Sequence, residues 1–442
     1  MHSLTSRPPR RPTTTASEPA GLQRSLGFWE LLASGVGIIV GAGIYVLIGA
    51  ATAEAGAAVW LSFALAATLS GLTALSYCEL AAMYPRAAAE YEYTSHAFPH
   101  WLAFLVGWVM IVGLVVAAAA VALGFARYAS VFVDIDQRVL ALGLIVVLCG
   151  IALTGVRRSS RLTLLLSLIQ VVGLLVVIAV GVPHVGEVNV IESTGATGVI
   201  GAAALVFFAF IGFDEVTTLS EETRQATRNI PLALLAALAV STVLYVAVAI
   251  ASVSVLGAEA LGSSERPLAD VLETAVGDTA GRLVAAIAVV STTNTTLLAL
   301  TAGSRMAFGM ARDGALPRRL ALVRGSGGAP VAAVIACSLA AAAFTLLGDL
   351  KDVAATTDVA IYLVFLATNA TVILLRFKLP NAERPFRTPI TIGRFPVVPV
   401  LAILATLLMM SQLDGVPLVT MAVLGGIGML LFGSLSIIRG RR

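Results

Sequence analysis

Charged residues are scarce in this chain. Of its 442 residues only 12% are Asp, Glu, Lys or Arg, whereas 58% are hydrophobic, and the mean hydropathy is +0.96. Soluble domains carry roughly 25% charged residues, so the composition excludes a soluble globular protein and predicts an integral membrane protein. The net charge of +3 is small, and we expect the lipid bilayer and a small molecule as partners, and no nucleic acid.

Cysteine and histidine are also scarce. The three cysteines lie in apolar stretches, without the spacing of a disulfide framework or a metal site. The four histidines lie near the chain ends or in loops between apolar runs. No constellation typical of a nucleophile, a metal site or a phosphate-binding loop occurs in an apolar run. The sequence therefore argues against an enzyme, and we expect neither a metal nor a cofactor.

Long apolar runs dominate the rest of the sequence. Crossing the hydrocarbon core takes about 20 apolar residues, and the sequence contains twelve runs of about that length. They lie at 28–50, 56–84, 101–126, 138–156, 162–182, 197–220, 231–256, 281–311, 330–348, 354–376, 395–412 and 416–437. The sequence thus predicts an all-α integral membrane protein with twelve transmembrane helices.

The basic residues predict the orientation of these spans. Cytoplasmic loops carry an excess of Lys and Arg. If both termini are cytoplasmic, few of the 28 basic residues fall on the other side, namely Arg127, Arg138, Arg266, Arg282 and Lys351. The polar N-terminal segment lacks the short apolar core of a cleavable signal peptide. We therefore expect a multi-pass protein of the cytoplasmic membrane whose two termini are both cytoplasmic.

The order of the spans suggests an internal repeat. Spans 1–5 and spans 6–10 can be laid over each other as two halves, each starting with an interrupted helix. Because five is an odd number, the second half starts on the opposite side of the membrane, which makes the repeat inverted. We predict a disordered tail at 1–25, a first repeat at 26–182, a second repeat at 197–376, and two accessory spans at 395–437.

The first span is interrupted by glycine. Four glycines occur in nine residues from Gly35 to Gly43, although each costs about 1 kcal/mol against Ala in a helix interior. An unwound stretch at Ile39–Gly43 would leave free N–H groups at Ala42, Gly43 and Ile44, where a carboxylate fits the start of a half-helix. The freed carbonyls before the break would bind an ammonium group. Close packing through small residues is the alternative.

The sixth span contains two acids beside a glycine. Asp214 and Glu215 follow Gly212 at the end of an apolar run. Ionisable groups at membrane depth are expensive and usually functional, so either acid is a candidate for proton coupling. Alternatively the span ends earlier and both acids are interfacial, and Glu79 in the second span leaves the same two interpretations open. Asp214 and Glu215 are the only acids that we expect to pair a cationic side chain at depth.

Three motifs in order resemble the amino acid–polyamine–organocation (APC) superfamily of permeases. They are Gly-Ala-Gly at 41–43, Phe-Phe-Ala-Phe-Ile-Gly-Phe-Asp at 207–214, and Ser-Arg-Met-Ala-Phe-Gly-Met-Ala-Arg-Asp-Gly at 304–314. The resemblance extends from about Leu26 to Phe432. It implies the five-plus-five inverted-repeat fold that is shared with sodium-coupled amino acid transporters, with helices 1 and 6 broken.

The resemblance also implies a substrate site. The substrate carboxylate would bind the N–H groups of Ala42 and Gly43, and its amino group the carbonyls of Ile39, Phe208 and Ile211. The expected substrate-binding residues are Ile39, Val40, Gly41, Ala42, Gly43, Ile44, Gly113, Ala117, Phe208, Phe210, Ile211 and Asp214. A short external helix that acts as a lid is implied between residues 258 and 278.

The sequence departs from the superfamily at two positions that bear on coupling and substrate. Gly113 stands where the cationic-amino-acid branch has Glu, and Gln170 where many proton-coupled members have Lys. Span 8 offers hydroxyl oxygens that could ligate sodium, although such hydroxyls also bond backbone carbonyls of their own helix. The candidate coupling or gating residues are Asp214, Glu215, Gln170, Ser291 and Thr292.

These observations together predict a secondary active transporter that works by alternating access. Because span 3 lacks a carboxylate, we expect a neutral, aliphatic amino acid as substrate, with transport coupled to a proton or sodium or running as exchange. The alternative is a permease for cationic amino acids or polyamines.

Overall fold

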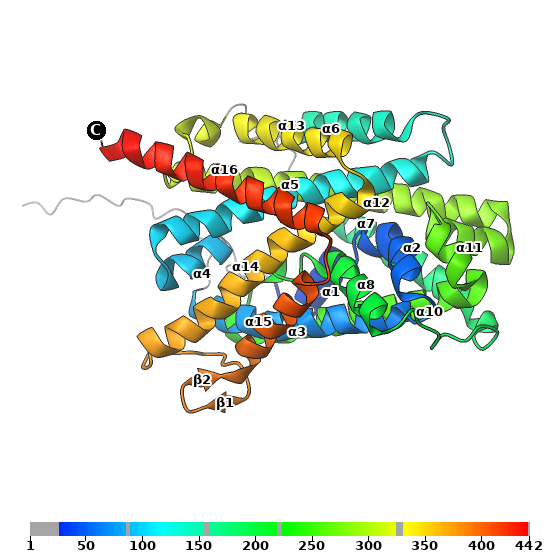
Figure 1. The fold of residues 1–442 in the computed structure, drawn as a ribbon, viewed down its shortest axis with the longest axis horizontal. Coiled ribbons are helices and arrows are strands. Elements are labelled where there is room, and N and C mark those ends of the chain that lie inside the picture. Colours follow the sequence, from blue (N-terminus) through cyan, green and yellow to red (C-terminus); the bar gives the residue numbers. More distant parts are fainter. Residues whose placement is uncertain (1–25, 85–88, 154–159, 219–222, 324–329, 441–442) are drawn as a thin grey trace, which may run out of the picture.

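A computed structural model of the chain describes residues 26–84, 89–153, 160–218, 223–323 and 330–440 (Figure 1). The predicted tail at 1–25 lies outside the described residues. The regular elements of the described part are helices, apart from one antiparallel hairpin formed by β1 (Thr391–Ile392) and β2 (Phe395–Pro396). Thr391 pairs with Pro396, and Ile392 with Phe395.

The first half of the chain begins with two helices separated by a short break. Its elements are α1 (Phe28–Ile39), α2 (Gly43–Ala55), α3 (Val59–Met83), α4 (Ala89–Ala97), α5 (His100–Ala129), α6 (Gln137–Leu153), α7 (Ser160–Gly181) and the 3₁₀ turn η1 (Val182–His184). A second interrupted helix follows, in the elements α8 (Ala196–Val206), η2 (Phe207–Phe210) and α9 (Glu215–Thr218).

The remaining helices are mostly long. They are α10 (Ala226–Ser263), α11 (Pro267–Val276), α12 (Asp278–Arg312), η4 (Arg318–Ala321), α13 (Val331–Leu347), α14 (Leu350–Lys378), α15 (Val397–Met410) and α16 (Gly415–Gly440). In α10 the chain departs from helical geometry at Gly257, whose φ is +75°. The short helix α11 lies in the loop where the sequence analysis expected one.

Eight of the described helices are long and apolar enough to cross a membrane, and the bent pair α1–α2 makes a ninth candidate. Three further helices, α6, α13 and α15, are apolar but have at most 17 residues. At 1.5 Å per residue, the 14 residues of α15 extend about 21 Å, which is less than a ~30 Å hydrocarbon core. The structure shows an all-α membrane protein; the prediction of twelve spans requires the three short helices to cross as well.

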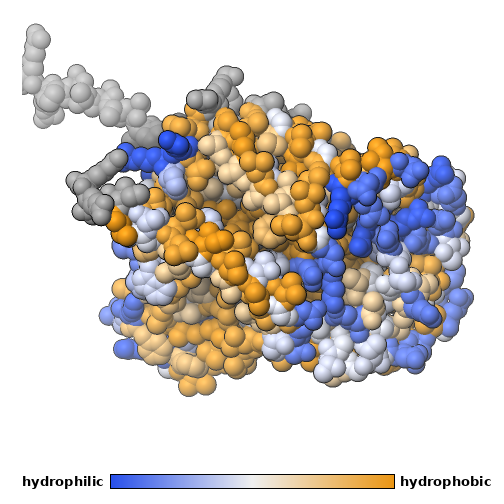
Figure 2. Space-filling view, turned by 45° about the horizontal axis from the view of Figure 1, so that its top comes forward, coloured by the Kyte–Doolittle hydropathy of each residue, from blue (hydrophilic) through white to orange (hydrophobic). Residues whose placement is uncertain are grey.

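The two ends of the bundle differ in their contents (Figure 1). The helix α4, the hairpin and the C-terminus lie at one end, which we call the α4 end. The helix α11 lies at the other, the α11 end. In Figure 2 hydrophobic residues cover most of the visible face, and hydrophilic ones gather on the right, which is the α11 side of Figure 1. This distribution fits a bundle whose apolar belt faces lipid.

The helix α5 is the centre of the bundle. Most of its apolar stretch is buried (89%), against 11% for α16. A helix that is apolar all round is buried in a large protein or a membrane bundle, and in α5 runs of Ala, Val and Gly allow neighbouring helices to approach closely. The helices α12 and α14 lie along α5, so α5 supports the elements that form the site described below.

A buried ion pair closes the α4 end. The Glu79 carboxylate of α3 accepts bonds from Arg376 Nε at 2.8 Å and Nη2 at 2.6 Å, and from Arg384 Nε at 3.1 Å. It also accepts the Thr388 backbone N–H at 2.8 Å. The Glu79 and Arg376 side chains are each 2% exposed. Neither interpretation of the sequence analysis therefore describes Glu79. Its carboxylate is buried but fully paired, and it joins α3 to α14 and to the loop before β1.

Candidate functional site

The first break spans residues 40–42. The helix α1 ends at Ile39, α2 begins at Gly43, and their axes are bent by 48°. Inside the break the Gly41 N–H donates to the Ile39 carbonyl at 2.7 Å, which forms a tight turn. The break thus lies within the predicted unwound stretch at Ile39–Gly43.

The second break follows the 3₁₀ turn η2. Ile211 is extended, with ψ of 137°, and Gly212 has φ of +107°. Only glycine adopts such a φ readily, so Gly212 lets the chain turn before α9 starts at Glu215. A Cβ on Gly212 would lie 2.9 Å from Ile38 Cγ2, which places the second break directly against the end of α1.

The two broken helices also touch at Gly43. A Cβ on Gly43 would lie 2.5 Å from the Ala209 Cα, closer than real side chains come to a backbone. Glycine at this position therefore serves the close approach of α2 to η2. The glycines of the first span serve both alternatives of the sequence analysis, because Gly41 lies in an unwound turn and Gly43 in a packed contact.

The backbone groups at the breaks are bonded by neighbouring helices. The Tyr245 hydroxyl of α10 lies 2.7 Å from the Ile39 carbonyl oxygen and 3.0 Å from that of Ala209. The Ala42 N–H donates to Thr295 Oγ1 of α12 at 3.2 Å. The prediction of a free N–H at Ala42 is thus wrong in this conformation, because a buried backbone group away from water needs a partner.

A cavity of about 70 Å³ lies between the breaks, α5 and α12. It is lined by Gly37, Ile38, Ile39, Gly41, Ala42, Gly43, Leu114, Ala117, Val121, Phe208, Ala209, Ile211, Gly212, Glu215, Asn294, Thr295, Leu298 and Ala299. Ligand pockets usually measure ~300–1,000 Å³, so the breaks close tightly around this space. Most of the lining side chains are apolar, and Glu215 is the one ionisable group among them.

The structure brings together only part of the predicted substrate site. Seven of its residues line the cavity, namely Ile39, Gly41, Ala42, Gly43, Ala117, Phe208 and Ile211. Five do not, namely Val40, Ile44, Gly113, Phe210 and Asp214. Gly113 instead faces α14, where a Cβ would lie 3.0 Å from Ala360 Cβ. The wall on α5 is formed by Leu114, Ala117 and Val121. Their i, i+3, i+7 spacing places them on one helix face, so the sequence pattern alone could have indicated this wall.

Asp214 lies outside the cavity, paired with an acid that the sequence analysis missed. Its carboxyl, on a residue 6% exposed, is hydrogen-bonded to that of Glu90 in α4. The Tyr77 hydroxyl donates to Glu90 Oε1 at 3.3 Å. Burial, and then the Asp214 carboxyl, raise the pKa of Glu90, because two adjacent carboxylates cannot both ionise cheaply. The pair joins the α4 end to the second broken helix.

The candidate coupling residues on α7 and α12 differ in their bonding. Gln170 is fully buried, and its side-chain Oε1 and Nε2 bond none of the described residues. The Ser291 hydroxyl is equally without a partner in the described part of the chain. Thr292 donates to the Ala288 carbonyl at 2.7 Å, which is the within-helix bonding that the sequence analysis gave as the alternative to a sodium site.

A further buried acid lies on α14, and the sequence analysis did not consider it. Asp358 of α14 is 0% exposed. The helix α14 begins at Leu350, one turn before the predicted span at 354–376, so Asp358 lies two turns inside the helix instead of near its edge.

Comparisons with known proteins agree on the family. A family model described as amino acid permease matches residues 26–432. The chain is 30% identical over 434 residues to a branched-chain amino acid permease of Bacillus subtilis, covering 93% of this chain and 92% of the relative. It is also 30% identical to a methylthioribose transporter of the same organism, over 98% and 97% of the two chains.

A more distant relative is the vacuolar cationic amino acid transporter 4 of Arabidopsis thaliana, which is 28% identical over 82% of this chain and 65% of its own. The matched proteins are transporters and not enzymes, as the sequence predicted. With a match over nearly its whole length, on a helical membrane bundle with two broken helices, the chain belongs to the amino acid permease family of the APC superfamily.

Proposed function

We propose that this permease moves neutral, aliphatic amino acids across the cytoplasmic membrane by alternating access, with ion coupling or by exchange. The observation that carries the proposal is the cavity between the two helix breaks, where backbone polar groups meet an apolar wall. Such breaks near the midplane are where secondary transporters bind substrates. The identity to a branched-chain amino acid permease supports the same substrate class.

The amino acid's charged ends would bind the breaks. Its carboxylate would accept the N–H groups of Ala42 and Gly43 at the start of α2, where the helix dipole favours an anion. Its ammonium would donate to the carbonyls of Ile39, Phe208 and Ile211. Since Ala42 and Ile39 already bond protein groups, binding requires these contacts to be exchanged for substrate.

The side chain of the substrate would lie against carbon atoms. On the α5 side the cavity presents Leu114, Ala117 and Val121, and on the α12 side Leu298 and Ala299. Such walls favour aliphatic groups by removing apolar surface from water, and they provide no partner for a second ammonium.

The membrane arrangement belongs to the same proposal. We infer twelve spans with an inverted repeat at 26–182 and 197–376, accessory spans at 395–437, and a cytoplasmic α4 end with both termini on that side. The basic loop segments around Arg318 and Arg384 support this orientation through the positive-inside rule. Asp214 would then act with Glu90 as a gate at the cytoplasmic side, and Glu215, Gln170, Ser291 and Thr292 would adjust coupling or gating near the breaks.

A permease for cationic amino acids or polyamines is the second candidate. It is favoured by Glu215, which lines the cavity, and by the identity to a cationic amino acid transporter. Glu215 is the one acid among the residues that line the cavity, which suits a single ammonium better than two.

The test is uptake by the purified protein in proteoliposomes, with labelled alanine, leucine, arginine, putrescine and methylthioribose. Each substrate is measured with an inward proton gradient, with a sodium gradient and with neither. We expect leucine and alanine to enter faster than the other compounds. Faster entry of arginine or putrescine would support the second candidate, and entry of methylthioribose alone would reject both.

A further inference from the structure

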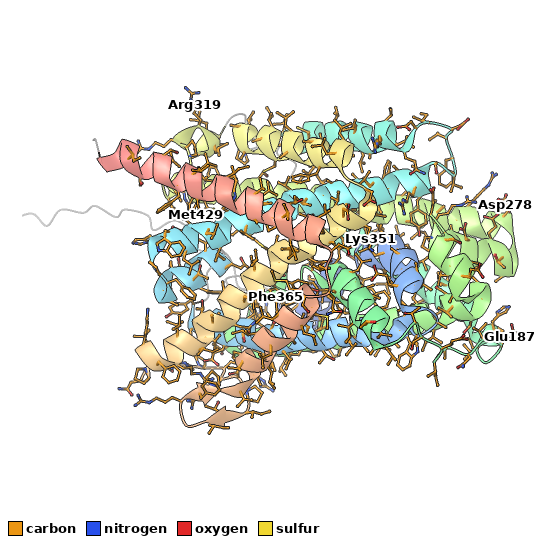
Figure 3. The ribbon with its side chains drawn as sticks, in the orientation of Figure 1. Glu187, Asp278, Arg319, Lys351, Phe365 and Met429 are labelled. Atoms are coloured by element: carbon orange, nitrogen blue, oxygen red, sulfur yellow. The ribbon has the colours of Figure 1, made fainter. Side chains whose placement is uncertain are left out.

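Asp358 is a buried acid that the proposed site does not use. It is 0% exposed, and neither carboxyl oxygen has a hydrogen-bond partner in the described structure. It lies on α14 between Lys351, near the start of that helix, and Phe365 in the middle of the bundle, both labelled in Figure 3. Eight residues separate it from Leu350, which places it about 12 Å along the helix axis.

No described charge compensates this acid. The helices α8 and α15, which pack against α14, contain no ionisable residue, and those of α5 and α16 are His100, Arg127, Tyr128 and Arg439 near their ends. The carboxylates Glu79 and Glu90 of α3 and α4 lie toward the opposite end of α14, and the Tyr77 ring of α3 packs on Phe365. Tyr362, one turn further along α14, is the described group with an electrostatic interaction with Asp358.

Burying an unpaired ionised carboxylate away from water costs a large free energy. A buried acid such as Asp358 therefore needs a bound cation or proton to neutralise it. A metal ion would require several oxygen ligands, whereas neither carboxyl oxygen of Asp358 is hydrogen-bonded to another group in the part of the chain described here. A proton requires a single oxygen. The surroundings therefore suit a proton and not a metal ion.

We propose that Asp358 is a proton-binding site of the transport cycle, occupied in this sealed conformation and reached from the α11 end when the bundle opens. The carboxylate binds one proton from outside and forms the neutral acid, and it releases that proton in another conformation. This proposal rests on the proposed transport function and adds the residue that couples it to protons.

The contacts of Tyr362 connect this proton site to the cavity. The Tyr362 hydroxyl donates to the Ala204 carbonyl of α8 at 3.0 Å, and its ring lies 4.6 Å from that of Phe207 in η2. The next residue, Phe208, lines the cavity. Ionisation of Asp358 would draw water to α14 and loosen its packing on α8 and η2, so closure around the substrate would follow protonation.

Proteoliposomes with an internal pH dye test the proposal through Asp358→Asn. A matched control is Asp352→Asn, an acid six residues earlier on the same helix and only partly buried. We expect the wild type and the control to take up protons with leucine. Asp358→Asn should lose at least tenfold in gradient-driven leucine accumulation and in proton uptake, yet keep leucine exchange within about twofold. Asp358→Glu should recover part of the coupling.

Proton uptake and accumulation by Asp358→Asn at wild-type level would overturn the proposal. A second measurement needs neither transport nor the Asn variant. Infrared titration of the wild type should show a carboxylic-acid C=O band that shifts in frequency in Asp358→Glu, and an unshifted band would also reject the proposal. Failure of the wild type to transport any amino acid would instead count against the proposed function, while this band would still report on Asp358.

Discussion

The Tyr245 hydroxyl lies 2.7 Å from the carbonyl oxygen of Ile39, the last residue of α1, and 3.0 Å from that of Ala209 in η2. One side chain of α10 therefore contacts both broken helices at the place where the substrate ammonium is proposed to bind. A hydroxyl has a single proton to donate, so Tyr245 satisfies one carbonyl at a time. In this conformation its hydroxyl therefore occupies the position that is proposed for the substrate ammonium.

Tyr245→Phe should therefore tighten substrate binding. Removing a competitor for the Ile39 carbonyl is worth about 1 kcal/mol, which corresponds to a roughly fivefold lower Kd for leucine. Calorimetric titration measures it. Tyr128→Phe is the matched control, since the Tyr128 hydroxyl donates to a buried carbonyl, that of Tyr45, at 2.7 Å outside the cavity. An equal change of Kd in both variants would contradict the role given to Tyr245.

Gly43→Ala should abolish most transport. The added methyl group would lie 2.5 Å from the Ala209 Cα, so α2 and η2 could not close as they do here. We expect initial leucine uptake to fall at least tenfold. Gly143→Ala in α6 is the control, because a Cβ there meets no atom within 4 Å and alanine stabilises a helix by about 1 kcal/mol over glycine. If Gly43→Ala took up leucine as fast as the wild type, the close approach of α2 to η2 would not be required for transport.

The sequence predicted those features of the site that depend on neighbouring residues, and it missed those that depend on residues far apart in the chain. The breaks at 40–42 and at Gly212 were predicted because glycine acts locally on the backbone. Tyr245 was missed because its bond to Ile39 joins residues far apart in the chain, and a tyrosine in an apolar run carries no local signal for it. The pairing of Glu90 with Asp214 and the burial of the Asp358 side chain likewise depend on how the helices pack against one another.

The pair of Glu90 and Asp214 should make stability depend on pH. Because burial and Asp214 raise the pKa of Glu90, the folded protein binds more protons than the unfolded chain. Stability is then full below the ordinary carboxyl range and is lost as the pH rises through the raised pKa, by up to about 1.4 kcal/mol per pH unit per proton. Thermal unfolding between about pH 5 and pH 9 measures this slope.

Glu90→Gln should flatten the slope, since the amide cannot ionise. Glu92→Gln should keep it, because Glu92 lies on the same helix but is more exposed and contacts His96. A wild-type slope in Glu90→Gln would show that the paired carboxyls do not control the pH response.

Glu79→Ala should be strongly destabilising. It leaves the buried Arg376 guanidinium without its carboxylate, a loss that typically costs 3–5 kcal/mol. Arg282→Ala is the control, since its partner Asp278 and Arg282 itself are 68% and 62% exposed and such pairs contribute at most about 1 kcal/mol. Denaturation of both variants in detergent gives the comparison, and similar losses of stability in the two would contradict the stabilising role of the buried ion pair at the α4 end.

Both charged ends of a neutral amino acid are proposed to bind at the two helix breaks. Calorimetric titration of the purified protein with leucine, leucine methyl ester, N-acetyl-leucine and arginine is the experiment that separates the contributions of these two ends. Hydrogen bonds to charged groups contribute about 1.5–3 kcal/mol, so blocking either end should weaken binding at least tenfold, and arginine should bind more weakly than leucine. If the blocked compounds bind as tightly as leucine, or if arginine binds more tightly than leucine, the breaks do not bind the two charged ends of a neutral amino acid.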